Sequence, residues 1–315
     1  MAKITPAHHD SLTEAGGAIA KGQLVAFGTE TVYGLGGDAT NPIAVAKIYA
    51  AKGRPAFNPL ISHIDSTSHA FDLGEPTLMA QQLADDYWPG PMTLILNKTP
   101  KCPVHDLATA GLDSIALRVP SKKEARLFLQ AAGCPVAAPS ANRSGRISPT
   151  RAQHVLEELG DCDDLAMILD MGAAEEGLES TVIDARGDAP VILRPGSITT
   201  TMIACSTGVM PTTPGKDIIS PGQLASHYAP SKPVVLDALA AQDGDIMIGF
   251  GTHGREAVLN LSTTGDLTEA AANLYDMLRS ADAQAGKRIA IAPIPEEGLG
   301  IAILDRLRRA AADRP

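Results

Sequence analysis

Residues 24–64, LVAFGTETVYGLGGDATNPIAVAKIYAAKGRPAFNPLISHI, organise the rest of this chain. The stretch opens with a short apolar run that predicts a strand at 24–27, and it continues into the glycine cluster 34–37, which predicts tight turns. Asn41 can cap a helix whose first turn holds Pro42, and a glycine and a proline at 53–55 end that helix. Hydroxyls, backbone amides and two cations therefore lie within one turn of chain, a combination typical of a site for a polar anion.

The composition is that of an ordinary globular protein. The chain has 315 residues, 44% of them hydrophobic and 20% charged, and its net charge of −10 argues against a broad nucleic-acid surface. No apolar stretch approaches the length of a membrane span, and the N-terminus has no apolar leader core. The four cysteines are scattered without a C-x-x-C pair, so we expect reduced thiols and a cytoplasmic, non-membrane protein.

Strands and helices alternate along the chain, and several strands are joined by short turns. This pattern predicts the α/β class, with a mixed, twisted sheet and helices on its faces. We expect a catalytic domain at 1–205, a linker rich in proline and glycine at 206–231, and a small doubly wound α/β domain at 232–315.

Two cations, Lys52 and Arg54, follow the predicted helix end. At this spacing on extended chain both side chains face the same way, so they could hold a polyphosphate. The alternative, an exposed basic turn, is equally compatible with the spacing alone.

A second group of polar side chains surrounds Ser140 and Asn142, directly after a buried strand predicted at 136–138. Ligands bind at the carboxyl ends of strands in α/β sheets, but serine and asparagine are also ordinary turn residues, and the turn alone is the simpler interpretation. Ser148 begins the next helix, where it could cap the helix or present amides to an anion.

Several familiar motifs are missing from the sequence. It contains no G-x-x-x-x-G-K-[ST], no H-E-x-x-H, no G-x-S-x-G and no His/Cys cluster with zinc spacing, so no metal site held by the protein itself is predicted. The glycines at 34–39 fit a dinucleotide fingerprint by count, but the following helix starts too late and no acidic residue ends a second strand.

In combination, the motifs resemble the YrdC-like domain in order and spacing. They are TETVYGLG at 29–36, KGRP at 52–55, NPLI at 58–61, PSAN at 139–142, SGRISPT at 144–150, ESTVID at 179–184 and LRPG at 193–196. The linker SPGQLASHYAP at 220–230 and the small C-terminal domain resemble the long, two-domain form of the L-threonylcarbamoyladenylate synthase family. Nearly the whole chain is covered. Ser121-Lys122-Lys123 and Gln223 depart from the frequent family residues outside the core motifs.

The resemblance implies a nucleotidyltransferase that makes threonylcarbamoyl-AMP from L-threonine, bicarbonate or carbon dioxide, and ATP, with release of pyrophosphate. It implies Mg²⁺ as a cofactor that accompanies ATP. The product would pass to a separate tRNA threonylcarbamoyl transferase complex that modifies the adenosine next to the anticodon. Tight nucleic-acid binding by this chain is therefore not expected.

The resemblance also implies residue roles. The expected threonine pocket consists of Thr31, His63, Arg118, Ala138 and Ser180. The expected ATP site consists of Lys52, Arg54, Asn58, Ser114, Ser140, Asn142, Ser148, Arg194 and Tyr228, with Lys52 and Arg54 as the catalytic cations. Because a carbamate loses carbon dioxide in water, we expect the site to close, with the linker that carries His227 and Tyr228 as a lid.

Two other functions share parts of this pattern. An RNA-binding or ribosome-maturation module is one, and the acidic charge balance argues against it. A YrdC-like domain that uses another carbamoyl donor is the second, and the sequence shows no acylphosphatase-like or zinc-finger segment to support it.

Overall fold

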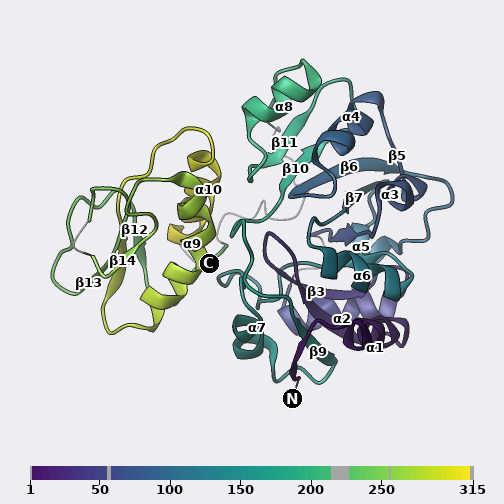
Figure 1. Ribbon diagram of the computed structural model, residues 1–315, viewed down its shortest axis with the longest axis horizontal. Coiled ribbons are helices and arrows are strands. Elements are labelled where there is room, and N and C mark those ends of the chain that lie inside the picture. Colours follow the sequence, from purple (N-terminus) through teal and green to yellow (C-terminus); the bar gives the residue numbers. More distant parts are fainter. Residues whose placement is uncertain (1, 55–57, 214–226, 255–256, 313–315) are drawn as a thin grey trace.

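The computed structural model describes residues 2–54, 58–213, 227–254 and 257–312. The chain forms two β-sheets, each covered by helices, which lie side by side (Figure 1). The large sheet has the order β1-β9-β2-β3-β8-β4-β7-β6-β10-β11, with β5 added beside β6. Parallel and antiparallel pairs alternate irregularly along it, which confirms the mixed sheet that the sequence predicts.

The large sheet and its helices have the following bounds. The strands are β1 Ile4–Pro6, β2 Leu24–Gly28, β3 Tyr33–Asp38, β4 Ile61–His63, β5 Gly74–Glu75, β6 Met92–Lys98, β7 Ser114–Arg118, β8 Val136–Ala137, β9 Leu165–Asp170, β10 Thr181–Asp184 and β11 Val191–Arg194. The helices are α1 His9–Ala20, α2 Pro42–Lys52, α3 Thr67–Leu73, α4 Leu78–Tyr87, α5 Asp106–Thr109, α6 Lys123–Ala132, α7 Ala152–Leu159 and α8 Thr200–Thr207.

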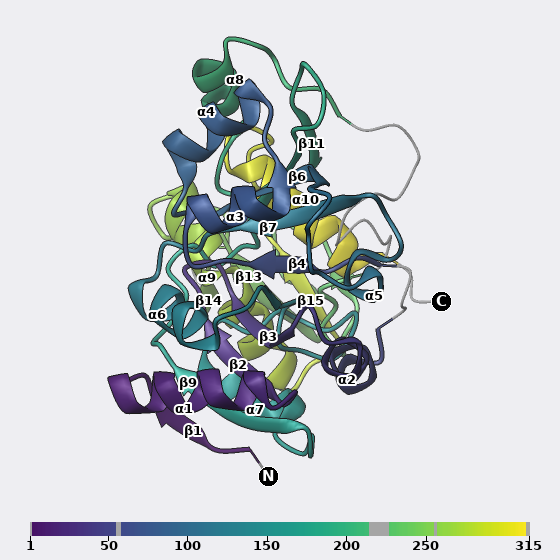
Figure 2. The same ribbon diagram turned by 90° about the vertical axis from the view of Figure 1, so that its right-hand side faces the viewer.

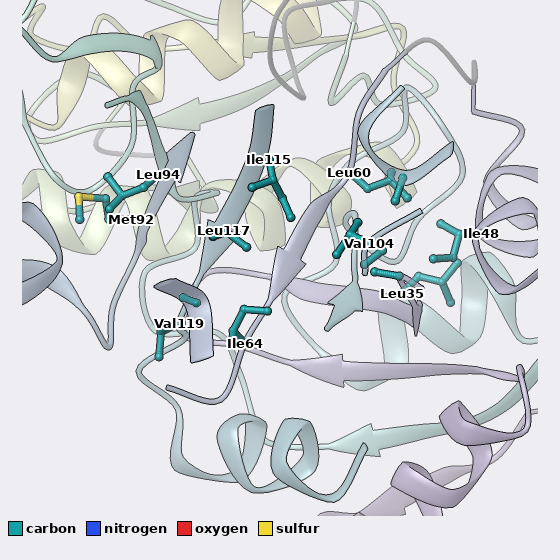
Figure 3. Close-up of a cluster of buried hydrophobic side chains, with 14 of the residues drawn as sticks. Leu35, Ile48, Leu60, Ile64, Met92, Leu94, Val104, Ile115, Leu117 and Val119 are labelled. Atoms are coloured by element: carbon teal, nitrogen blue, oxygen red, sulfur yellow. The ribbon is translucent and has the colours of Figure 1, made fainter. Parts of the chain in front are cut away.

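The sheet buries both of its faces because successive side chains of a strand point to opposite sides. On β2, Leu24 and Ala26 join the larger core, whereas Val25 and Phe27 pack against α1 and α6 on the other face. Figure 3 shows the larger core, where the side chain of Leu35 on β3 lies beside Ile48 of α2, and Leu117 on β7 belongs to the same cluster. With both faces packed, the ends of the strands are left to form a site.

The glycine cluster 34–37 lies inside strand β3, so the prediction of tight turns was wrong. The glycines serve close packing. A Cβ on Gly36 would lie 2.9 Å from Val136 Cγ1 and 3.0 Å from Phe27 Cε1, closer than side-chain packing permits. Glycine is therefore required in this strand by its neighbours and not by its own backbone angles.

Other elements also differ from the predicted ones. The short helix α5 forms at Asp106–Thr109, where the sequence predicts no helix. Helix α7 begins after Arg151, so Ser148 does not cap it; its hydroxyl instead donates to Glu179. The strand β1 and the helices α3 and α8 carried no periodic signal strong enough to predict them. Helix α2, by contrast, has the predicted Asn41 cap and ends at Gly53 in the left-handed conformation.

The C-terminal part has a four-stranded, all-parallel sheet in the order β12-β15-β13-β14. Its elements are β12 Val234–Val235, β13 Asp245–Gly249, β14 Leu259–Asn260, α9 Leu267–Ala283, β15 Arg288–Ile291 and α10 Gly300–Ala311. Helices α9 and α10 lie between this sheet and the N-terminal part (Figures 1 and 2). Within the described ranges, no helix is both long and apolar enough to cross a membrane.

Replacing Gly36 with alanine tests the packing of β3. We expect Gly36→Ala to lower the free energy of unfolding by about 1–3 kcal/mol, because the new methyl group overpacks the contact with Val136 and Phe27. Gly17→Ala is the control, since a Cβ there meets nothing within 4 Å in the middle of α1. The control should gain about 0.5–1 kcal/mol. Urea unfolding of the two variants measures both effects, and equal stabilities would refute the packing explanation.

Candidate active site

A pocket lies where the ends of several strands of the large sheet meet. Strands β4 and β7 are parallel and end in register, which places His63 opposite Arg118. Ala138 follows β8, the other neighbour of β4. The pocket is lined by Thr29, Thr31, Val32, Gly34, Arg54, Pro59, Leu60, Ile61, His63, Arg118, Ala138, Pro139, Ser140, Glu179, Ser180, Arg194, His227 and Tyr228. All five residues of the predicted threonine pocket are in this set.

Arg118 is held by partners from the turn between β2 and β3. Its Nη1 donates to Thr31 Oγ1 at 2.8 Å, its Nη2 to Glu30 Oε1 at 2.7 Å, and its Nε to Gly90 O at 3.4 Å. Burial alone would raise the pKa of Glu30, but the Arg118 charge together with hydrogen bonds from Arg118 and from backbone N–H groups outweighs it and lowers this pKa. One N–H on each terminal nitrogen of Arg118 still has no acceptor among the described residues.

His63 is buried and uncharged. Burial, helped by the Arg118 charge, lowers its pKa to about 3. Its Nδ1 has no hydrogen-bond partner in the described part of the chain, and its ring meets the Phe27 ring edge-on at 5.8 Å. A buried nitrogen without a partner beside a pocket is available to a ligand.

Arg194, at the end of β11, is fastened to Ser180. Its Nε and Nη2 donate to Ser180 O at 3.1 and 3.0 Å, and Nη2 also reaches Ser180 Oγ at 3.1 Å. The Ser180 hydroxyl additionally contacts Thr93 Oγ1 at 2.7 Å. This cluster connects the predicted threonine pocket with the predicted ATP site, because Ser180 belongs to the first and Arg194 to the second.

The two cations after α2 have different surroundings. Arg54 lines the pocket, and burial lowers its pKa to about 10, so it stays charged near neutral pH. Lys52 lies behind the pocket wall, where its ammonium donates to the carbonyls of Ser140 and Asn142. Burial, followed by the Arg54 charge, lowers the Lys52 pKa well below its usual value. The structure therefore brings only Arg54 of this pair to the pocket surface.

The remaining predicted ATP-site residues are also divided between the pocket lining and the layer behind it. Ser140 lines the pocket, whereas Asn142 is fully buried and donates to the carbonyls of Arg143 and Arg146. Ser148 donates to Glu179, and the backbone carbonyl of Asn58 accepts from Tyr49, while Asn58 Oδ1 has no partner among the described residues. Ser114 lies at the opposite end of β7 from Arg118. None of these four, which are Asn58, Ser114, Asn142 and Ser148, lines the pocket.

The end of the predicted linker closes one side of the pocket. His227 and Tyr228 both line it, and their rings meet at 4.1 Å. Burial lowers the pKa of His227 to about 3. Residues 214–226, where most of the predicted lid falls, lie outside the described residues.

Two buried acids were missed by the sequence reasoning. Glu30 and Glu179 both lie inside motifs quoted above, beside hydroxyl residues. A carboxylate next to an apolar strand is almost never buried without a partner, so each position signals the need for a cation, although the sequence does not single out Arg118 or Arg306 as that cation. Both acids now form buried ion pairs, Glu30 with Arg118 at 2.7 Å and Glu179 with Arg306 at 2.8 Å.

The donor set does not fit a metal ion held by the protein alone. No group of three or more His, Cys, Asp or Glu side chains that could bind a metal occurs in the described part of the chain. Glu179, the one carboxylate of the lining set, is already engaged by Arg306, Tyr275 and Ser148.

Comparison with known proteins identifies the family to which this chain is similar. The family described as Telomere recombination matches residues 17–196, and the threonylcarbamoyl-AMP synthase C-terminal domain matches residues 198–312. The threonylcarbamoyl-AMP synthase of Bacillus subtilis is 38% identical over 326 residues, which cover 96% of this chain and 93% of that protein. That of Pyrococcus abyssi is 39% identical over 324 residues, covering 95% and 94%.

Solved structures agree with this result. Pyrococcus abyssi Sua5 complexed with L-threonine superposes with a TM-score of 0.88 at 36% identity, and the match covers 98% of this chain and 97% of that one. Escherichia coli YciO, at 23% identity and a TM-score of 0.54 over 62% of this chain, shares the fold alone. The full-length matches of sequence and structure, together with both matched domains, show that this chain belongs to the threonylcarbamoyl-AMP synthase family.

Proposed function

We propose that this chain synthesises L-threonylcarbamoyl-AMP from L-threonine, bicarbonate or carbon dioxide, and ATP, with release of pyrophosphate. One observation supports the proposal in addition to family membership. The lining of a single pocket combines Thr31, which is hydrogen-bonded to Arg118, with the neighbouring cations Arg54 and Arg194. We call the first group the hydroxyl-lined end of the pocket and the second its cationic end. An amino acid and a nucleotide phosphate would thus meet within one enclosure.

The hydroxyl-lined end suits threonine. The free N–H groups of Arg118 can take the carboxylate, since a guanidinium matches carboxylate geometry. Thr31 and Ser180 can hydrogen-bond the amine or hydroxyl of threonine, and neutral His63 offers its unpartnered Nδ1. Ala138 supplies a small apolar wall beside them.

The cationic end suits ATP. Arg54, Arg194, Ser140 and Tyr228 line it and can contact the nucleotide directly. We assign Lys52, Asn142, Ser148 and Asn58 to the layer behind these contact residues, because none of the four lines the pocket. Lys52, Asn142 and Ser148 also donate hydrogen bonds to protein groups. The assignment of Ser114 to the ATP site stays a prediction.

In this reaction the substrates supply their own nucleophiles, so the protein needs to position them and does not need a nucleophilic side chain. The threonine amine forms a C–N bond with carbon dioxide and releases a proton, which gives a carbamate. A carbamate oxygen then attacks the α-phosphorus of ATP, and the bond to the pyrophosphate breaks as the new P–O bond forms. Arg54 and Arg194 can stabilise the negative charge that develops on the phosphate oxygens.

We place Mg²⁺ with ATP and not with the protein. The ion prefers phosphate oxygens and water completed by few carboxylates, and the lining residues offer no free carboxylate among those described. We further propose that the enzyme works in the cytoplasm and that the product passes to a tRNA threonylcarbamoyl transferase complex.

The assay of the purified protein tests the proposed reaction, with Arg54→Met as the decisive variant. The wild type should release pyrophosphate only when threonine and bicarbonate are both present. Arg54→Met should lower kcat/KM for ATP at least about a hundredfold, because it removes a desolvated phosphate contact. It should destabilise the fold less than Lys52→Met does, because the bonds from Arg54 to the carbonyls of Asn58 and Pro59 are long, at 3.5 and 3.3 Å. Arg186→Met is the control, since Arg186 pairs with Asp184 in an exposed position. Pyrophosphate release without threonine would contradict the proposal.

Lys52→Met should behave differently from Arg54→Met. The buried carbonyl of Asn142 loses its donor, and that of Ser140 keeps only the N–H of Asn142, so the free energy of unfolding should fall by about 1–3 kcal/mol along with activity. Chemical denaturation of both variants measures the difference. A Lys52→Met protein as stable as the wild type would place the ammonium in the pocket and not behind it.

The buried histidines predict a pH dependence of stability. His63 and His227 have pKa values near 3 when folded and an ordinary value of 6.5. As the pH falls below about 6.5, the unfolded chain binds protons that the folded chain cannot bind. The free energy of unfolding should therefore fall by up to about 1.4 kcal/mol per pH unit for each histidine.

Urea unfolding between about pH 6 and pH 5 isolates this effect, because the pKa of Glu179 is lowered from 4.5 to about 2 and its contribution is lost only at lower pH. His63→Asn should show a smaller slope. His69→Asn is the control, since His69 is exposed and Asp65 raises its pKa. A slope that is the same in the wild type and in His63→Asn would contradict a neutral, buried His63.

A further inference from the structure

Glu179 lines the pocket from the N-terminal part but is held mainly by the C-terminal part. Its Oε1 accepts from Ser148 Oγ at 2.6 Å, and its Oε2 accepts from Arg306 Nε at 2.8 Å and from Tyr275 OH at 2.9 Å. Tyr275 belongs to α9 and Arg306 to α10. The carboxylate is thus the point where helices of the second sheet reach the pocket wall.

Arg306 is unusual among the charged residues because its side chain is 0% exposed. The Tyr228 ring lies 5.5 Å from its guanidinium carbon, and the Tyr228 and Tyr275 rings stack at 5.7 Å. The guanidinium also donates to the backbone carbonyl of Glu179 at 3.4 Å and to Asp305 at 2.8 Å. The arginine therefore contacts both Glu179 and Tyr228, two residues that line the pocket.

The position of Glu179 explains why such a partner is needed. The next residue is Ser180, which holds Arg194, so the carboxylate lies beside the cationic end of the pocket. Burial would raise the pKa of Glu179, but the charges of Arg306 and Arg194 and the hydrogen bonds from Ser148 and Arg306 together outweigh it and keep the group ionised. Without Arg306, a buried negative charge would face the place where phosphate groups are expected, and it would attract Arg194 away from them.

We propose that Arg306 is a positioning residue for the nucleotide end of the pocket. It neutralises Glu179 and holds it against Ser148 and Tyr275, which leaves Arg194 free to face an anionic ligand. The C-terminal domain would thus complete the pocket electrostatically, in addition to carrying the end of the linker. This inference rests on the proposed function, because it takes the anionic ligand to be ATP.

Two variants test the proposal in the full-length chain. Arg306→Met should raise the dissociation constant for ATP, measured by calorimetry, and its KM at least about tenfold, which corresponds to about 1.4 kcal/mol. The double variant Arg306→Met, Glu179→Gln removes both charges and should recover most of the affinity. A role limited to docking the domains predicts that the double variant is no better than Arg306→Met, and that result would overturn the proposal.

Arg308→Met is the matched control. Arg308 lies on the same helix and forms the same kind of ion pair, with Glu296 at 2.8 Å, but its side chain is 56% exposed. This variant should bind ATP as the wild type does. If it weakens ATP binding as much as Arg306→Met does, loss of any arginine from α10 would have the same effect, and the proposal fails.

Tyr275→Phe covers the case in which Arg306→Met does not fold. It removes one donor to Glu179 and keeps the ring beside Tyr228, and we expect a weakening of ATP binding by about threefold or more. Unchanged ATP affinity in a folded Tyr275→Phe protein would then overturn the proposal. Calorimetry with ATP alone separates this outcome from failure of the proposed function, in which the wild type would form no threonylcarbamoyl-AMP whatever the variants do.

Discussion

The buried ion pair between Glu179 and Arg306 constrains both parts of this molecule. A carboxylate can remain charged in the interior only when a cation and hydrogen-bond donors surround it, and here the cation comes from another domain. Such a pair is weak evidence for stability, since its desolvation cost is large. The ion pair instead has a structural role, because it fixes the position of α10 relative to strand β10, which begins directly after Ser180.

Charge balance in the pocket follows from two such pairs. Glu30 neutralises Arg118 at the hydroxyl-lined end, and Arg306 neutralises Glu179 at the other end. What remains at the pocket surface, among the residues described, is the positive charge of Arg54 and Arg194. A protein with a net charge of −10 therefore carries a cationic pocket, so its overall charge does not predict the charge of its binding site.

The sequence predicted those elements whose signals are local. Helix α2 followed from a cap at Asn41 and a left-handed Gly53, and both are present. Strand β3 was missed because Gly36 is required by its contacts with Phe27 on the neighbouring strand and with Val136, which is far away in the sequence. All five residues predicted for the threonine pocket line the pocket, and their roles stay predictions. Glu30 and Glu179 were overlooked because the sequence does not show which arginine pairs with a buried acid.

By itself, the sequence determined the α/β class, the order of the motifs and the set of polar residues that gather at the strand ends. Periodicity, caps and turn residues act over a few positions, and one chain displays them directly. Only the tertiary structure decided which of those residues face the pocket: Arg54 does, whereas Lys52 lies behind it. It also decided that Arg306 completes the site, because burial and ion pairing depend on contacts between segments far apart in the chain.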